Sequence, residues 1–146
     1  MKELFRIHIF LKNIFEVQGS KGTARMILFD GNVTSDIFTW VVLPGAVDTQ
    51  IKIIGDKNKL SARYILDGVD SDRQRCQIFI QNDGIDLENG ESIKTIPFIL
   101  TNSENLKWLE NSNVKGEVVG EKDGIIIKIY VDDPNVPNSL LYRGNQ

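Results

Sequence analysis

The sequence predicts an all-β fold, a single antiparallel β-barrel of roughly nine or ten strands with one short helix near residues 101–111. Two observations support this prediction. Apolar and polar residues alternate with a period of two along most of the chain, which is the spacing of side chains on a half-buried strand. Turn residues interrupt these runs at short intervals, so each run is short enough for one strand. We expect residues 1–146 to form one domain.

The first strand is expected in LFRIHIFLK, where Phe5, Ile7, Ile9 and Leu11 share one face and Arg6 and His8 share the other. Further strands are expected, in chain order, in GTARMILFDG, IFTWVVL, DTQIKIIG, KLSARYILDG, CQIFIQNDG, SIKTIPFIL, VKGEVVGE and GIIIKIYVDD. The last two are joined through EKDG, which is typical of a tight hairpin.

One segment, TNSENLKWLENSN, has the features of a helix. Thr101 and Glu104 have the spacing of a capping box, and Leu106 and Leu109 fall on one face. We expect this helix to cover one end of the barrel. The C-terminal tail is broken by prolines, but its Leu-Leu-Tyr segment (140–142) is apolar enough to dock on the rest of the chain.

Composition and charge argue against several classes of partner. The net charge is only −3, so no basic field exists to hold nucleic acid or an anionic membrane. The apolar start of the chain is interrupted by charges, unlike an export signal, and no run approaches membrane-spanning length. Cys76 is the single cysteine, which excludes an intrachain disulfide and favours a reducing, cytoplasmic setting.

The segment VVLPGAVDTQ (41–50) predicts a sharp corner between two strands. Pro44 has no N–H for a ladder, and Gly45 can adopt backbone angles that other residues avoid. If GDKN (55–58) is a two-residue turn, Ile54 pairs with Lys59 and Gln50 lies opposite Arg63. Asp48 would then be one diagonal away from Arg63, so Asp48, Gln50 and Arg63 are expected to form a polar triad.

The same segments carry a resemblance to a known family. FTWVVLPGAVDTQ, LSARYILDGVD, CQIFIQNDG and TNSENLKWLE together resemble the bacterial and fungal family named Domain of Unknown Function 3237. The resemblance implies a compact β-barrel and no settled activity. It points to Asp48, Arg63 and Tyr64, and also to Arg25 in TARMI. The family often has two glycines after the proline, where this chain has Gly45 and Ala46.

Two classes of function follow from these residues. In the first, the barrel binds a small molecule, with Arg63 pairing with its carboxylate if the molecule is acidic, and Asp48 serves as the base in an isomerase- or cyclase-like proton transfer. In the second, the chain is a non-catalytic assembly protein whose polar hairpin face and tail form a subunit interface. Asp48 and Arg63 can also be a structural ion pair across the hairpin, without any ligand.

The remaining candidates have structural interpretations. Trp40 is either a core residue or an aromatic surface on which a ligand stacks. His8 is expected to be a partly exposed strand residue, and Cys76 a small core residue. The acidic loop DGVDSDRQ lacks the pattern of a calcium loop, and no metal or nucleotide cofactor is expected.

We place the expected ligand site at the barrel mouth beside the Pro44–Gly45 corner, formed by Asp48, Gln50 and Arg63, with Arg25 and Trp40 as further candidates. The apolar set Ile51, Ile53, Leu60, Ala62, Tyr64 and Leu66 shares the other hairpin face in this register. A homodimer is also expected, because GIIIKIYV and the SLLY tail would add apolar surface.

Overall fold

The computed structural model describes residues 1–35, 37–122, 124–133 and 136–142. These residues form nine strands and two short 3₁₀ helices: β1 (Lys2–Gln18), β2 (Gly22–Thr34), β3 (Thr39–Val42), β4 (Val47–Ile53), β5 (Asn58–Val69), β6 (Arg75–Asp86), β7 (Ile93–Thr101), η1 (Lys107–Asn111), β8 (Val114–Glu121), β9 (Gly124–Val131) and η2 (Asn138–Leu140). The predicted all-β class is therefore confirmed.

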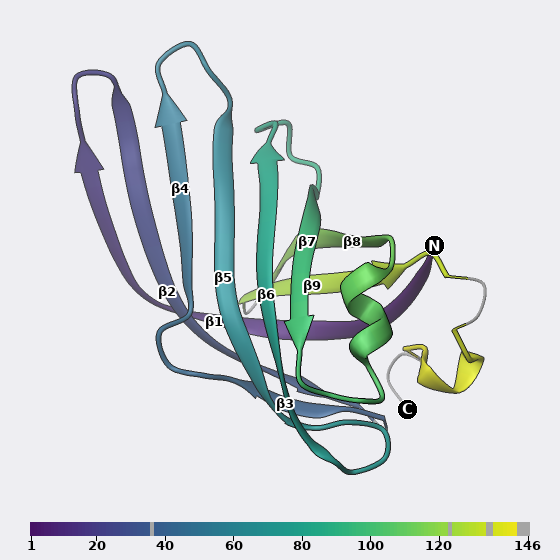
Figure 1. Cartoon of the computed structure of the whole chain (residues 1–146). Helices are drawn as coiled ribbons and strands as arrows, with labels where there is room; N and C mark the ends of the chain where they lie inside the picture. The colour runs from purple at the N-terminus through teal and green to yellow at the C-terminus, as the bar shows by residue number, and fades with distance from the viewer. Residues whose placement is uncertain (36, 123, 134–135, 143–146) are drawn as a thin grey trace.

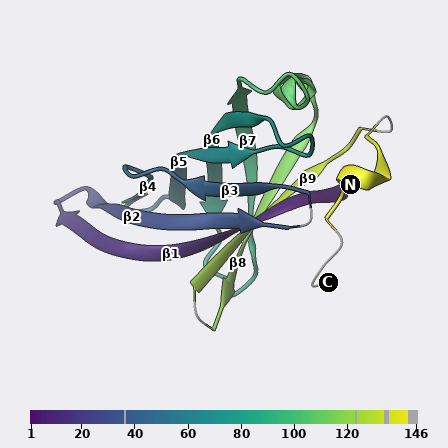
Figure 2. The same cartoon turned by 90° about the horizontal axis from the view of Figure 1, so that it is seen from below.

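The sheet is antiparallel and closes on itself. Its strands follow the order β1-β9-β8-β7-β6-β5-β3-β2-β4, and the additional pairing of β1 with β2 completes the barrel. Both β3 and β4 lie between β2 and β5, so these two short strands share one position. Figure 1 shows that β1, β2, β4 and β5 extend beyond the other strands at one end, and we call this end the open mouth. In Figure 2, β1 and β2 run across the direction of β8 and β9.

The break between β3 and β4 is the predicted corner. Gly45 has a φ of 101°, in the left-handed region that a side chain disfavours. Ala46 is buried, and its carbonyl accepts a hydrogen bond from the Phe29 amide at 3.2 Å. Because of this corner, the segment before it (β3) and the segment after it (β4) both pair with β2 and β5.

A bulge in β1 reverses which residues face inward. Ile9 pairs with Gly31 and Leu11 with Phe29, but after a register shift Ile14 pairs with Ile27 and Glu16 with Arg25. Odd-numbered residues such as Ile7 and Ile9 are buried before the shift, as predicted. Beyond it the even-numbered Glu16 faces inward, because one extra residue changes the side of every side chain that follows.

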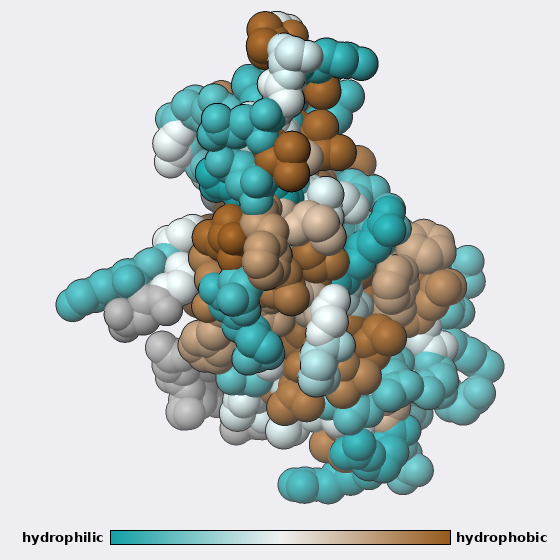
Figure 3. Space-filling model, turned by 90° about the vertical axis from the view of Figure 1, so that its left-hand side faces the viewer, coloured by the Kyte–Doolittle hydropathy of each residue, from teal (hydrophilic) through white to brown (hydrophobic). Residues whose placement is uncertain are grey.

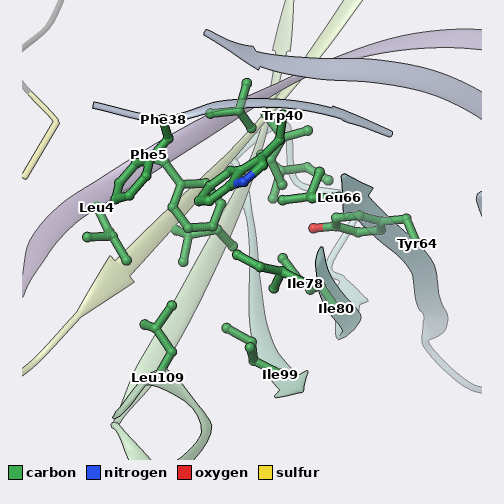
Figure 4. Close-up of a cluster of buried hydrophobic side chains, with 14 of the residues drawn as sticks. Leu4, Phe5, Phe38, Trp40, Tyr64, Leu66, Ile78, Ile80, Ile99 and Leu109 are labelled. Atoms are coloured by element: carbon green, nitrogen blue, oxygen red, sulfur yellow. The ribbon is translucent and has the colours of Figure 1, made fainter. Parts of the chain in front are cut away.

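The main hydrophobic core lies at the closed end of the barrel. Trp40 stacks on Phe38 with ring centroids 4.7 Å apart, and Phe5 meets Trp40 edge-on at 5.2 Å. Figure 4 shows these rings beside Leu66 and Ile78, with Leu109 of η1 at the other side of the cluster. Such aromatic pairs add to the stabilisation that burial alone provides.

The helical segment is shorter than predicted and is not an α-helix. The predicted capping box is wrong, because Thr101 is the last residue of β7 and its hydroxyl donates to the Gln77 carbonyl at 2.7 Å. The 3₁₀ helix begins only at Lys107 and has no side-chain cap. Leu106 and Leu109 are nevertheless buried, so this segment does cover one end of the barrel.

The predicted docking of the tail is confirmed for its described residues. The Tyr142 amide donates to the Glu3 carbonyl at 3.0 Å, and the Arg6 guanidinium lies 4.2 Å from the centre of the Tyr142 ring. Leu140 and Leu141 pack against the core. Pro134 and the final residues 143–146 lie outside the described residues.

The apolar surface expected from β9 is absent. Ile126, Ile127 and Ile129 are each at most 4% exposed, since β9 lies between β1 and β8. Because the tail leucines are also packed, neither segment supplies the exposed surface on which the homodimer was predicted.

Candidate functional site

The register of the β4–β5 hairpin differs from the predicted one. Asp48 pairs with Ala62, and Val47 pairs with Arg63. The prediction that Gln50 lies opposite Arg63 is wrong, because the Ile54 amide donates to the Lys21 carbonyl instead of pairing with β5. The strands differ from the predicted register by an odd number of residues, so every side chain of β4 changes sides relative to β5.

This change of sides separates the expected triad. Asp48 and Gln50 face the barrel interior with Leu60 and Ala62, whereas Arg63 faces outward and is exposed. The predicted apolar face is divided as well: Leu60, Ala62, Tyr64 and Leu66 are inside, and Ile51 and Ile53 are outside. The expected ion pair between Asp48 and Arg63 is therefore not formed.

Asp48 is a partly buried acid with an unsatisfied oxygen. Its Oδ2 accepts a hydrogen bond from Gln50 Nε2 at 2.9 Å, while its Oδ1 is buried without a partner. Burial raises the pKa of Asp48, and the hydrogen bond from Gln50 offsets only part of this effect. The carboxyl group therefore holds a proton more readily than an exposed aspartate does.

Two further interior groups lie near Asp48 in the strand order and also lack partners. The Tyr64 hydroxyl on β5 and Nδ2 of Asn82 on β6 are buried without a hydrogen bond. Figure 4 shows that the Tyr64 hydroxyl points into the barrel. Buried polar groups are normally paired, so unpaired ones on three adjacent strands suggest a place for a polar ligand or water.

Asn82 is held in place by its neighbours on β7 and β8. Its Oδ1 accepts a hydrogen bond from the Thr95 hydroxyl at 2.6 Å. Gly116 makes room for this pair, since a Cβ there would lie 2.2 Å from Thr95 Oγ1. The amide is thus fixed with its free N–H₂ group available.

Asp48, Ala62 and Asn82 lie side by side across three strands. Neighbouring strands are about 4.8 Å apart, so Asp48 and Asn82 are separated by about 10 Å at their Cα atoms. The short Ala62 side chain lies between them. Sequence reasoning missed Asn82, although it continues the inward series Cys76, Ile78 and Ile80 and is the first polar residue in it.

A polar hollow of about 320 Å³ lies at the open mouth. Its lining consists of Glu16, Gln18, Thr23, Arg25, Gln50, Lys52, Asn58 and Glu88. Arg25 pairs with Glu16 at 2.9 Å, and Lys52 lies 3.8 Å from Glu88. Gln50 lines the hollow and also bonds to Asp48, so it links the mouth to the interior acid.

The structure thus brings Arg25, Gln50 and Asp48 to one side of the sheet, and it leaves Trp40 in the core. Trp40 is only 1% exposed and packs between Phe5 and Phe38. Cys76 is also buried there, and burial raises the pKa of its thiol.

Other groups considered for chemistry have structural roles. His8 is exposed, as predicted. Asp70 ties the acidic loop to the segment after β7, because it accepts hydrogen bonds from Ser103 Oγ and Asn105 Nδ2 at 3.0 Å each. Within the described ranges, no three His, Cys, Asp or Glu side chains are placed to hold a metal ion, and no helix is long and apolar enough to cross a membrane.

The fold and site define a closed antiparallel barrel with a partly unsatisfied polar layer beneath an open mouth. No family model matches the chain. A protein of Clostridium acetobutylicum described as a UPF0311 protein is 32% identical over 100 residues, which are 58% of this chain and 61% of that protein. The chain therefore matches less than two thirds of that relative, and the resemblance to Domain of Unknown Function 3237 stays a prediction.

Solved structures confirm the barrel. A Clostridium acetobutylicum protein with unknown function has a TM-score of 0.73 at 27% identity, covering 89% of this chain and 94% of that one. A β-barrel-like protein of Acinetobacter baumannii has a TM-score of 0.69 at 18% identity over 89% and 93% of the two chains. An enzyme from Penicillium herquei has a TM-score of 0.67 at 13% identity over 90% and 92%. The last two share the fold alone.

Proposed function

We propose that the chain binds a small, uncharged molecule inside the barrel mouth and that Asp48 exchanges a proton with it. The observation that supports this proposal most strongly is the set of unpaired polar atoms on β4, β5 and β6: Asp48 Oδ1, the Tyr64 hydroxyl and Asn82 Nδ2. Together they offer acceptors and donors for a hydroxyl or carbonyl group of a ligand. The apolar residues around them suit the body of such a molecule.

The charge of the site favours a neutral ligand over the acidic one expected from the sequence. The acidic ligand was expected to pair with Arg63, which lies on the outer face. Arg25 at the mouth already pairs with Glu16. Lys52, the other described cation that lines the mouth, lies 3.8 Å from Glu88, so a carboxylate bound near Asp48 would meet a like charge without a free cation among these described residues, which is unfavourable in a buried site.

Asp48 has the properties of a general acid or base. Burial raises its pKa, and general catalysts work best when their pKa approaches the working pH. The reaction class we propose is the transfer of a proton between carbon or oxygen positions, as in an isomerisation or cyclisation. The barrel is a fold that an enzyme from Penicillium herquei also uses.

Binding can be tested by NMR with neutral and charged probes. We expect phenol and cyclohexanone to shift the backbone amide signals of Asp48, Tyr64 and Asn82, and benzoate to shift them less. Ala62→Leu places a larger side chain between Asp48 and Asn82 and should abolish these shifts. The matched control is Ala24→Leu on the exposed outer face of β2, which should leave them unchanged.

Proton transfer needs a separate measurement. Exchange of the α-hydrogens of cyclohexanone for deuterium should be faster with the protein than without it, and Asp48→Asn should reduce this gain about 100-fold. The control Arg63→Gln, on the outer face, should keep the full rate. Retention of the rate in Asp48→Asn would refute the catalytic part, while probe shifts that survive Ala62→Leu would refute the binding site.

A further inference from the structure

The outer face of the barrel carries a large apolar groove opposite to the interior site. The groove has a volume of about 1240 Å³ and spans β2, β4, β5, β6 and β7. Six large apolar side chains in it are 41–66% exposed: Met26, Ile51, Ile53, Ile85, Ile96 and Phe98. We call these six residues and the polar residues between them the outer groove. Figure 3 views the molecule from the side of β1 and β2 and shows that hydrophobic residues reach the molecular surface on that side as well.

The exposed apolar area of the outer groove is large for a protein surface in water. A large side chain that is half exposed presents about 100 Å², so the six together present about 600 Å². Apolar patches of this size usually mark an interaction site. A stable dimer buries about 800 Å² on each partner, of which somewhat more than half is apolar. The outer groove with its polar residues therefore has the size and composition of one half of a dimer interface.

The outer groove carries Arg63 and Asp83, which have opposite charges, so the same surface on a second copy can pair with both. Arg63 is exposed, and no carboxylate of the described residues is bonded to its guanidinium. Asp83 accepts hydrogen bonds from Ser61 and Gln81, and no described cation pairs with it. Arg63 lies opposite Gln81 on the neighbouring strand, so Arg63 and Asp83 share this face.

We infer that the outer groove is the interface of a homodimer in which two copies of this chain meet face to face. A two-fold axis brings the same surface of both copies together, so a residue pair that is complementary forms twice. Arg63 of one protomer pairs with Asp83 of the other, and the reverse pair forms at the same time. The apolar side chains of β4 and β7 fill the space around these two ion pairs.

The oligomeric state tests the inference with single apolar changes. Analytical ultracentrifugation should show a dimer for the wild-type chain at micromolar concentration. Phe98→Asp should raise the dissociation constant about 30-fold or more, the effect of removing an important interface residue. Val41→Asp is the matched control, because Val41 is 51% exposed on β3 but does not line the groove, and it should leave the dimer intact.

Charge-reversal variants test the proposed ion pair between Arg63 of one protomer and Asp83 of the other. Arg63→Asp alone and Asp83→Arg alone should each weaken the dimer about tenfold or more, since like charges then meet. The double variant restores opposite charges and should return the dissociation constant close to that of the wild type. Circular dichroism of each variant should keep the β spectrum, because these side chains are on the surface.

Three results would overturn the inference. The first is a wild-type chain that remains monomeric at high concentration. The second is a dimer that Phe98→Asp and both charge reversals leave unchanged. The third is a monomer that binds octanoate or lipid vesicles through the groove, which would assign this surface to an apolar ligand or a membrane instead. None of these results depends on the interior site, so the two proposals stand or fall separately.

Discussion

The Asp48 side chain combines burial with an oxygen that has no partner, and this gives a stability prediction with a definite sign. Its pKa is raised in the folded state, so folding favours the protonated form. The contribution of Asp48 to stability is therefore fully present below the unfolded pKa and is lost as pH rises through the folded pKa.

We expect Asp48→Asn to raise the free energy of unfolding at pH 7 by about 1 kcal/mol, because the amide keeps the bond to Gln50 without a buried charge. The gain should disappear near pH 3, where Asp48 is protonated in both states. Urea unfolding at the two pH values measures this difference, and Asp30→Asn on the exposed surface is the control. A gain that is equal at both pH values would contradict the explanation.

Asp70 shows the opposite behaviour. It is 2% exposed, and its carboxylate accepts hydrogen bonds from the Asp72 and Gln74 amides in addition to Ser103 and Asn105. Burial alone would raise its pKa, but these hydrogen bonds together lower it. This carboxylate therefore stabilises the fold above its unfolded pKa, and the stabilisation is lost as pH falls through the folded pKa.

We expect Asp70→Ala to lower the free energy of unfolding by about 3 kcal/mol at pH 7, because several donors lose a charged acceptor. Asp72→Ala in the same turn, which is exposed, should cost much less. Denaturant titration of both variants compares the two sites. Equal costs would show that the turn, and not the buried carboxylate, holds β5 to the segment after β7.

Among the elements, the corner between β3 and β4 has the clearest sequence cause. We expect Gly45→Ala to destabilise the fold by about 1 kcal/mol, because φ at this position is 101°. Gly120→Ala is the matched control, since a Cβ there meets nothing within 4 Å and its φ is not in the left-handed range. Thermal unfolding should show a lower midpoint for the first variant alone.

The strands also show which parts of the fold could be predicted from the sequence. Period-two patterns predicted a strand at each of the nine strand positions of the described structure, because each strand has one face toward the core. They did not predict the β1 bulge between Leu11 and Ile14. At a bulge the alternation of apolar and polar residues is interrupted, and in the sequence this interruption cannot be distinguished from the end of a strand. The register of β4 against β5 was also missed, because it depends on a bond from Ile54 to Lys21 that lies outside the hairpin.

These errors changed which residues were expected to form the candidate site. Asp48 and Gln50 were correctly expected to lie together near the mouth, and Arg25 is the direct neighbour of Gln50 on β2. Arg63 was assigned to the wrong face by the register. Asn82 was missed because a polar residue at an inward position is recognised only when the two faces of the strand are known.

For the whole molecule, the docked tail and the outer groove are separate features with different expected effects. Deleting residues 136–146 removes Val136, which is 6% exposed, and the contacts of Leu140 and Leu141 with the core. We expect this truncation to lower the free energy of unfolding by about 2 kcal/mol.

The same truncation should leave the dimer dissociation constant unchanged, because no described residue of the tail lines the outer groove. Denaturant titration and sedimentation of the truncated chain test the two effects independently. A truncated chain that is stable but monomeric would place the interface at the tail, contrary to the inference drawn from the groove.

The pairing of β1 with β9 also has a consequence for biosynthesis. Lys2 pairs with Val131 and Ile9 with Ile125, so β1 leaves the ribosome well before β9, the strand with which it pairs. At about 5–20 residues per second, that interval lasts on the order of ten seconds. During this time β1 can pair with β2, but its other edge is open to any extended chain nearby. The open edge of β1 is therefore exposed to non-native pairing until β9 emerges from the ribosome.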